Sequence, residues 1–288
     1  MAKAPGHQFG QLIGHLVEEI VHSTLDDFAK KYGYYLDKQG ARGKARKGNK
    51  VTWLDKYDCE HDLDFVIEKN GSADQRGRPL AFIETAWRRY TKHSKNKAQE
   101  IQGAILPTAE KYWSDAPFLG VVLVGIFTAK AITQMEKTGF RVLYVHRSAI
   151  MGAFERAGIP VNFDESTPDK DFKKAVRGFN ELTPSQLTKF KNDLREIMKA
   201  DFDSFISKLE AALARQINKI VITPLFGNST EFLTARDAKT FLEKSLPDSG
   251  QGPLLKIDVL VCYDNGSRID ASFRKIEEIR AFLDYVAA

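Results

Sequence analysis

The chain has 288 residues, of which 43% are hydrophobic and 28% charged, a balance typical of a globular protein with a substantial core. Its net charge of +5 and pI of about 9.0 are modestly basic. No apolar run approaches the roughly 20 residues of a membrane helix, and the N-terminus lacks the apolar core of a signal peptide. Cys59 and Cys262 lie far apart, which argues against a disulfide framework or a zinc site. We therefore expect a soluble, cytoplasmic protein.

The first half of the chain alternates helical and strand patterns. Apolar residues recur at helical spacing over residues 11–31, which predicts an amphipathic helix. The glycine-rich basic stretch up to residue 49 is typical of a mobile loop. Residues 63–68 and 80–87 predict two strands joined by a turn, hence a hairpin. Further expected elements are a helix over residues 94–113, a strand over 118–127, a helix over 129–137, a strand over 141–146 and a helix over 148–157.

This alternation predicts the fold class. Strands that alternate with helices favour an α/β core with a mixed central sheet flanked by helices. Proline and acidic residues over 158–171 indicate a boundary. We therefore expect a core at residues 1–162 and a separate C-terminal unit at residues 163–288.

The expected C-terminal unit contains both helices and strands. Thr183, Pro184 and Gln186 form the start signal of a helix that runs to about residue 217. A hairpin is expected over residues 254–273 around an Asp-Asn-Gly turn, followed by a helix over 275–286. We interpret this α+β unit as a recognition or dimerisation region.

Charge is distributed in blocks rather than evenly. Residues 38–50 hold six basic residues and no acid, and residues 88–97 hold five basic residues and a histidine. Between them, residues 55–64 are rich in carboxylates. Basic segments on either side of an acidic cluster suit a metal site that acts on a phosphate backbone. Solvent-exposed loop and helix charges are the alternative interpretation.

The hairpin brings two carboxylates into position for such a site. Asp64 stands at the start of one predicted strand and Glu84 near the end of the other. Glu84 lies between apolar residues, where an acid is costly unless it is paired or binds a cation. Mg²⁺ takes oxygen ligands, commonly one or two carboxylates with water and substrate phosphate.

On these residues, together with the stretch ETAWRRYTKHSKNKAQEIQGA, the chain resembles the PD-(D/E)XK nuclease superfamily, and type II restriction endonucleases in particular. The resemblance covers roughly residues 10–150 and implies a restriction-endonuclease-like catalytic core. It implies that Asp64 and Glu84 bind Mg²⁺, with Mn²⁺ as a substitute, and act in catalysis. It further implies that Glu18 or Glu19 lines the site and that Glu100 is an extra metal ligand.

One position departs from this pattern. The family places a lysine two residues after the glutamate, where this chain has Ala86. Lys95 or Lys97, on the next helix, is expected to take over the catalytic role of that lysine. Alternatively, Ala86 is an inactivating substitution, or the protein is a naturally weak or inactive nuclease.

Basic residues after Glu84 are candidates for DNA contacts, since arginine and lysine contacts to phosphate position a protein without reading sequence. Trp87 and Tyr90 suit packing better than base stacking, and the lone histidine suits a DNA or structural contact better than a catalytic base. The expected DNA-binding residues are Arg88, Arg89, Lys92, His93 and Lys95.

The sequence thus predicts a homodimeric, Mg²⁺-dependent, site-specific deoxyribonuclease that cuts double-stranded DNA. A repair or junction nuclease is the nearest alternative. An inactive DNA-binding protein on a nuclease fold is the alternative that Ala86 keeps open. The chain has no P-loop, Rossmann glycine pattern or HExxH motif, so nucleotide cofactors and catalytic zinc are not expected.

Overall fold

A computed structural model of the protein describes residues 4–91, 94–161, 163, 167–225, 227–244 and 256–287. The chain divides into two compact units, which are described separately. The larger unit comprises residues 1–111 and 117–209, and the smaller unit comprises residues 112–116 and 210–288. The fold is mixed α/β, as the alternation of elements predicted.

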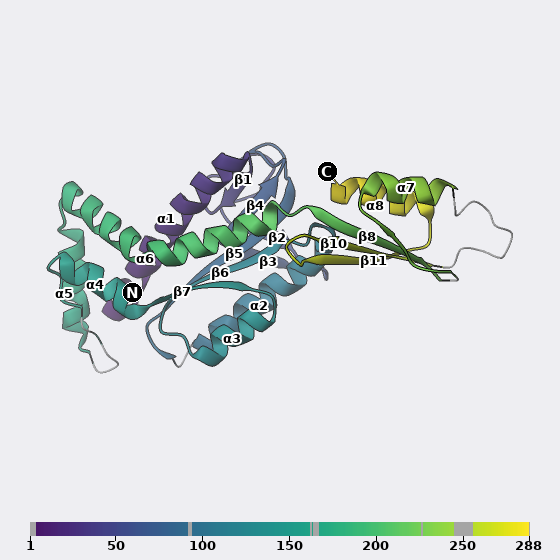
Figure 1. Cartoon of the computed structure of the whole chain (residues 1–288). Coiled ribbons are helices and arrows are strands. Elements are labelled where there is room, and N and C mark those ends of the chain that lie inside the picture. The colour runs from purple at the N-terminus through teal and green to yellow at the C-terminus, as the bar shows by residue number, and fades with distance from the viewer. Residues whose placement is uncertain are drawn as a thin grey trace. The chain divides into compact units, whose positions relative to one another are not determined.

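A five-stranded mixed sheet forms the centre of the larger unit, in the order β1-β4-β5-β6-β7 (Figure 1). Strands β1, β4 and β5 pair antiparallel, whereas β5, β6 and β7 run parallel. A short hairpin, β2 with β3, stands apart from this sheet. The strand bounds are β1 Tyr35–Lys38, β2 Val51–Leu54, β3 Glu60–Leu63, β4 Phe65–Lys69, β5 Arg78–Arg88, β6 Phe118–Gly125 and β7 Arg141–His146.

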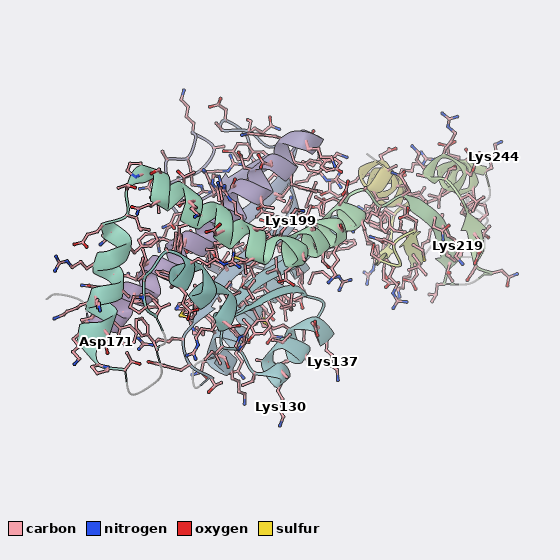
Figure 2. All side chains as sticks on the ribbon, turned by 60° about the vertical axis from the view of Figure 1, so that its left-hand side comes forward. Lys130, Lys137, Asp171, Lys199, Lys219 and Lys244 are labelled. Atoms are coloured by element: carbon pink, nitrogen blue, oxygen red, sulfur yellow. The ribbon has the colours of Figure 1, made fainter. Side chains whose placement is uncertain are left out.

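Helices cover both faces of this sheet. Helices α1 and α6 lie on one face, and α2 and α3 lie on the other (Figure 1). Helix α3 is amphipathic: Ala131 and Met135 are buried, while Lys130 and Lys137 extend into solvent (Figure 2). The helix bounds are α1 Pro5–Tyr32, α2 Ser94–Lys111, α3 Ala129–Lys137, α4 Arg147–Arg156, α5 Asp169–Asn180 and α6 Pro184–Leu213.

Helix α1 is longer than its apolar pattern predicted, but its buried face is the expected one. Leu16, Ile20, Leu25 and Phe28, which recur at helical spacing within the predicted range, are buried. The helix ends at Gly33, whose φ of 69° lies in the left-handed region that favours glycine. Lys30 and Lys31 in its last turn complement the negative end of the helix dipole.

The boundary predicted after residue 162 is wrong, because α5 and most of α6 belong to the larger unit. The ring of Phe172 on α5 packs 5.9 Å from that of Phe9 on α1, and Phe190 on α6 lies 4.9 Å from Phe154 on α4. These apolar contacts extend the core well beyond the loop that the prolines and acids mark. The division falls instead near the C-terminal end of α6.

The start of α6 confirms the predicted capping signal. The backbone N–H of Thr183 donates to the side-chain oxygen of Gln186 over 2.9 Å, and the N–H of Gln186 donates to Oγ1 of Thr183 over 3.4 Å. This reciprocal pair satisfies donors that the first helical turn leaves free. Helix α6 ends at Leu213, short of the predicted residue 217, because strand β8 begins at Ile217.

The smaller unit is an antiparallel sheet in the order β11-β10-β8-β9 with two helices. Its buried core includes Ile220, Val259, Val261 and Leu283. The predicted hairpin is confirmed as β10 with β11, and Gly266 in its turn has a φ of 80°. The bounds are β8 Ile217–Pro224, β9 Thr230–Phe232, α7 Ala235–Lys244, β10 Ile257–Tyr263, β11 Arg268–Phe273, α8 Ile276–Ala287 and a 3-10 turn, Trp113–Asp115.

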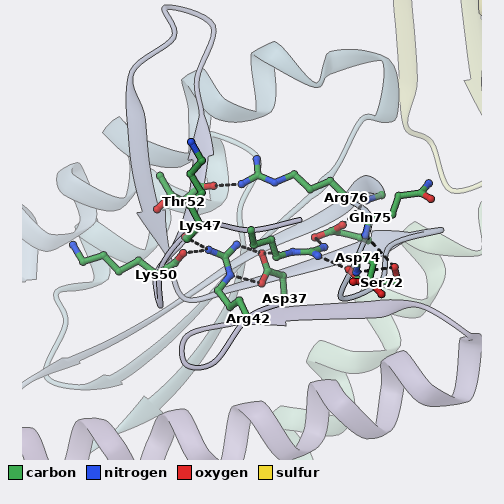
Figure 3. Close-up of polar contacts among 12 residues, drawn as sticks. Asp37, Arg42, Lys47, Lys50, Thr52, Ser72, Asp74, Gln75 and Arg76 are labelled. Carbon is green, nitrogen blue, oxygen red and sulfur yellow. Dashed lines mark hydrogen bonds and ion pairs between the residues drawn. The ribbon is translucent and has the colours of Figure 1, made fainter. Parts of the chain in front are cut away.

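The basic segment of residues 38–50 is held in place by buried ion pairs (Figure 3). Arg42 pairs with Asp37 over 2.5 Å, and Arg46 pairs with Glu68 over 2.6 Å. Nε of Arg46 also lies 3.1 Å from a carboxylate oxygen of Asp37. All four side chains are at most 2% exposed. The expectation of a mobile loop is therefore wrong for this segment, and two of its six basic groups are neutralised by buried carboxylates, while Lys50 pairs with the exposed Asp62.

Candidate functional site

The register of the β4–β5 hairpin sets Asp64 opposite Glu84. Phe65 pairs with Ile83, so the next position of the same register joins these two acids. The backbone N–H of Asp64 donates to Oε1 of Glu84 over 3.0 Å. Thr85 donates to Oδ2 of Asp64 from its backbone N–H over 2.7 Å and from its hydroxyl over 2.8 Å. Both carboxylates are therefore held by hydrogen bonds on a rigid element.

An open cleft with a volume of about 740 Å³ lies over these acids. Helix α1 forms one wall, where glycines replace bulkier side chains. A Cβ on Gly6 would lie 2.5 Å from Nη1 of Arg89, so glycine at this position leaves room for the guanidinium. The lining residues include Gly6, Gly10, Gly14, Glu18, Asp64, Glu84, Thr85, Ala86, Arg88, Arg89 and Lys97.

Burial and neighbouring charge raise the pKa of Glu84 to about 8. Loss of hydration is the larger cause, followed by the negative charge of Asp64, while Lys97 acts in the opposite direction. Burial and the charge of Asp64 also raise the pKa of Glu18. Glu18 therefore joins the site from α1, as predicted for one of the two glutamates. A cation placed among the three acids would stabilise the charged forms that burial and the charge of Asp64 disfavour.

The structure distinguishes between the two candidate lysines. Lys97 lines the cleft, and its charge lowers the pKa of Glu84. Lys95 is exposed and is not among the residues that line the cleft. Ala86 is buried and lines the same cleft as Lys97. The cleft is therefore lined by a lysine of α2, whereas strand position 86 contributes an alanine.

Glu100 lies one helical turn from Lys97, and the two are paired over 2.6 Å. Its side chain is 65% exposed, and its charge contributes to the raised pKa of Glu84. This geometry makes Glu100 a partner that holds Lys97 in place. A ligand role for Glu100 stays a prediction.

The two predicted arginines reach the cleft in different ways. Arg88 is half-buried, burial lowers its pKa, and its Nε has no hydrogen-bond partner among the described residues. Arg89 stacks over Tyr90 at 4.3 Å and over Phe172 at 4.4 Å. Nη1 of Arg88 donates to the carbonyl oxygen of Trp87 over 2.9 Å, whereas Arg89 is anchored by aromatic rings. Lys92 and His93, also predicted to contact DNA, lie outside the described residues.

The remaining acidic candidate on α1 is engaged elsewhere. Glu19 pairs with Lys191 of α6 over 2.6 Å. In the acidic stretch, Asp58 pairs with Lys111 over 2.5 Å and Asp62 pairs with Lys50 over 2.5 Å. These acids have cationic partners and behave as surface groups.

Sequence reasoning missed Thr85 and a second cleft that shares Glu18 and Asp64 with the first. Strand alternation predicts that the side chain of Thr85 lies on the face opposite Glu84, so no pattern indicated its bond to Asp64. A signal did exist for the second cleft. His15, Glu18 and His22 are spaced three and four residues apart, which puts them on one face of α1.

Two carboxylates, those of Asp64 and Glu84, are the candidate metal ligands of the cleft. Across the described residues, no group of three His, Cys, Asp or Glu side chains is arranged to hold a metal ion. Mg²⁺ does not require such a group, because it commonly keeps several waters and takes one or two carboxylates. In that same part of the chain, Oδ1 of Asp64 and Oε2 of Glu84 accept no hydrogen bond. These two free oxygens fit a hard cation.

No protein-family model matches the chain, and no curated protein matches it. Among solved structures, the crystal structure of AF1548, a protein of unknown function, aligns with 69% of this chain and 98% of its own. The identity is 12% and the TM-score 0.30, a likeness too weak to carry an argument. No helix in the described residues is both long and apolar enough to cross a membrane.

Proposed function

We propose that the cleft over Asp64 and Glu84 hydrolyses phosphodiester bonds of double-stranded DNA with Mg²⁺. The observation that carries the proposal is the pair itself: a buried Glu84 opposite Asp64, both fixed by hydrogen bonds and facing a cleft with basic side chains. Acids and bases so close together suit a substrate that carries negative charge and needs a cation. The expected restriction-endonuclease-like core is part of this proposal.

Asp64 and Glu84 are the residues that would hold Mg²⁺, through the oxygens that accept no hydrogen bond within the described residues. The ion would supply Lewis-acid stabilisation of the phosphate and lower the pKa of a bound water, with Mn²⁺ as a substitute. Thr85 holds the carboxylate of Asp64 in one orientation. Arg88 is placed to contact a phosphate oxygen.

Lys97 is the residue proposed to position the attacking water. It enters the cleft beside Glu84 and is fixed by Glu100 over 2.6 Å. An ammonium group at this point stabilises charge that develops on the phosphate and donates a hydrogen bond to water. Lys97 would thus do from α2 what a lysine at position 86 would do from β5.

The proposal is tested by incubating plasmid and phage DNA with purified protein in Mg²⁺, Mn²⁺ or chelator, followed by gel analysis. Asp64→Ala and Glu84→Ala are compared with Asp62→Ala, a nearby exposed acid that pairs with Lys50. Discrete metal-dependent fragments, lost in the first two variants alone, are the expected result. A smear with the same dependence indicates a repair or junction nuclease. DNA binding without cleavage in either metal would overturn the enzyme proposal in favour of an inactive binding protein.

The lysine assignment gives a separate prediction. Lys97→Ala should lower the cleavage rate by about 10²-fold or more, the range typical of a positioned proton-transfer or water-orienting group. Lys95→Ala should change it by less than about threefold, because Lys95 does not line the cleft. Adding Ala86→Lys to Lys97→Ala should restore part of the activity, since both positions face the same cleft. Equal rates for Lys97→Ala and Lys95→Ala would contradict the assignment.

Cutting both strands of a symmetric target takes two such clefts, so we propose a homodimer for the site-specific activity. The smaller unit is proposed as its recognition or dimerisation part. Sedimentation of the protein with and without duplex DNA measures this directly. A monomer that produces only nicks would contradict the dimer.

A further inference from the structure

The second cleft lies beside the first and shares two of its acids. It has a volume of about 510 Å³, and Glu18 and Asp64 belong to both clefts. A long ligand that covers Asp64 can therefore continue from one cleft into the other. The lining residues are His15, Glu18, Glu19, His22, Lys38, Gln39, Gly40, Asn49, Asp64 and Phe65.

Lys38 is the cationic group of this second cleft. Its Nζ lies 2.6 Å from Nε2 of His22. Burial and the charge of Lys38 lower the pKa of His22, so the neutral imidazole accepts a hydrogen bond from the ammonium group. The imidazole is stacked on Phe65, with an angle of 8° between the ring planes. An ammonium group has three donors, so two remain for an anion in the cleft.

The acids in the second cleft oppose an anion less than their number suggests. Glu19 is paired with Lys191 over 2.6 Å. Asp64 belongs to the proposed cation site. The second cleft thus has a positively charged side chain, Lys38, at one end and Asp64, a proposed ligand of the cation, at the other.

The buried ion pairs of the basic segment fix Lys38 in this place. Successive side chains of a strand point to opposite faces. Asp37 is therefore directed to Arg42 and Arg46, while Lys38 is directed to His22. The N–H of Gly40 donates to the carbonyl oxygen of Asn49 over 2.9 Å and closes the segment. The wall of the second cleft is thus formed before any ligand arrives, which lowers the entropic cost of binding.

We infer that the second cleft binds a phosphate group of the polynucleotide next to the one that lies over Asp64 and Glu84, with Lys38 as its ligand. This inference rests on the proposed function, because it takes the same polynucleotide as substrate. It assigns Lys38 to substrate binding and leaves the reaction itself to the first cleft. Arg88 and Lys38 then contact the backbone on either side of the two acids.

The test is fluorescence anisotropy of a labelled DNA duplex in Ca²⁺ without Mg²⁺, at salt concentrations from about 50 to 200 mM. Lys38→Ala should weaken binding and make the slope of log affinity against log salt shallower by about one unit, as expected for one lost phosphate contact. Lys44→Ala is the matched control: it removes an exposed charge from the same segment but lines neither cleft. Circular dichroism checks that both variants fold.

Identical salt slopes for Lys38→Ala and Lys44→Ala would overturn the inference. The result for the proposed function is read separately. If the wild type binds DNA through Lys38 but never cleaves it, the inference stands and the nuclease proposal fails. If cleavage occurs, Lys38→Ala should raise KM with little change in kcat, whereas Asp64→Ala should abolish kcat. A calorimetric titration with inorganic phosphate completes the test. Binding of phosphate that depends on Lys38, in a protein that does not bind DNA, would also overturn the inference.

Discussion

Glu84 carries an electrostatic cost that can be measured without any substrate. In the folded protein its pKa is raised from about 4.5 to about 8, first by burial and then by the charge of Asp64. Between these pH values the folded state holds a proton that the unfolded state has lost. The stability that this proton contributes is fully present below about pH 4.5 and is lost as the pH rises to about 8.

Glu84→Gln should therefore become more stable relative to the wild type as the pH rises from 5 to 8. The amide removes the titrating group and keeps a similar shape. Urea denaturation in chelator at several pH values measures the difference in the free energy of unfolding. The control is Glu231→Gln, an exposed acid paired with Lys219, which should follow the wild-type curve. A difference that does not change with pH would contradict the raised pKa.

At the residue scale, sequence patterns could predict the two acids but not their full surroundings. Asp64 and Glu84 follow from hairpin geometry, because antiparallel pairing brings the start of one strand beside the end of the other. The choice between Lys95 and Lys97 depends on which face α2 turns to the cleft, and two residues on a helix point about 200° apart. The bond from Thr85 to Asp64 depends on a bend at the strand end that no periodicity encodes.

At the element scale, the basic segment shows how distant residues override local pattern. Glycines and lysines alone predict a mobile loop. Arg46 nevertheless meets Asp37 of β1 and Glu68 of β4, and its Nη1 donates to the carbonyl oxygen of Ser72. These partners are brought together by the sheet, so the ordering could not be predicted from the segment itself.

Arg46→Ala should lower the free energy of unfolding by about 3–5 kcal/mol, because it leaves the buried carboxylate of Glu68 without a cation and Asp37 with Arg42 alone. The same variant should weaken DNA binding indirectly, since the wall that holds Lys38 loses its support. Chemical denaturation gives the first quantity and anisotropy the second. Lys44→Ala, exposed on the same segment, should change stability by less than about 0.5 kcal/mol. A small effect of Arg46→Ala would show that the segment is held by other contacts.

Elements with strong local signals were predicted well. Helix α3 and strand β7 match their expected bounds, and the capping pair of Thr183 and Gln186 marks the start of α6. The β2–β3 hairpin was missed because each strand has four residues, too few for a clear alternation. Strand β8 was missed, because the expected helix ended at about residue 217 and a short apolar run does not by itself distinguish strand from helix.

At the scale of the whole molecule, the two units divide near residue 209 rather than after residue 162. The prediction was wrong because amino-acid composition indicates where loops lie, not where a core ends. The segment around residue 162 contains prolines and acids, yet Phe172 and Phe190 after it complete the core before it. A boundary is set by where apolar contacts stop, and these contacts become visible only in three dimensions.

Each unit has its own apolar core, which predicts two transitions in thermal unfolding rather than one. Leu283 is fully buried in the core of the smaller unit, so Leu283→Ala should destabilise that unit by about 2–5 kcal/mol and shift one transition alone. The matched control is Leu233→Ala in the same unit, where the leucine is 74% exposed and its loss should cost less than about 0.5 kcal/mol. Scanning calorimetry of the full chain resolves the transitions. A single transition that moves as a whole in Leu283→Ala would show instead that the two cores unfold as one cooperative system.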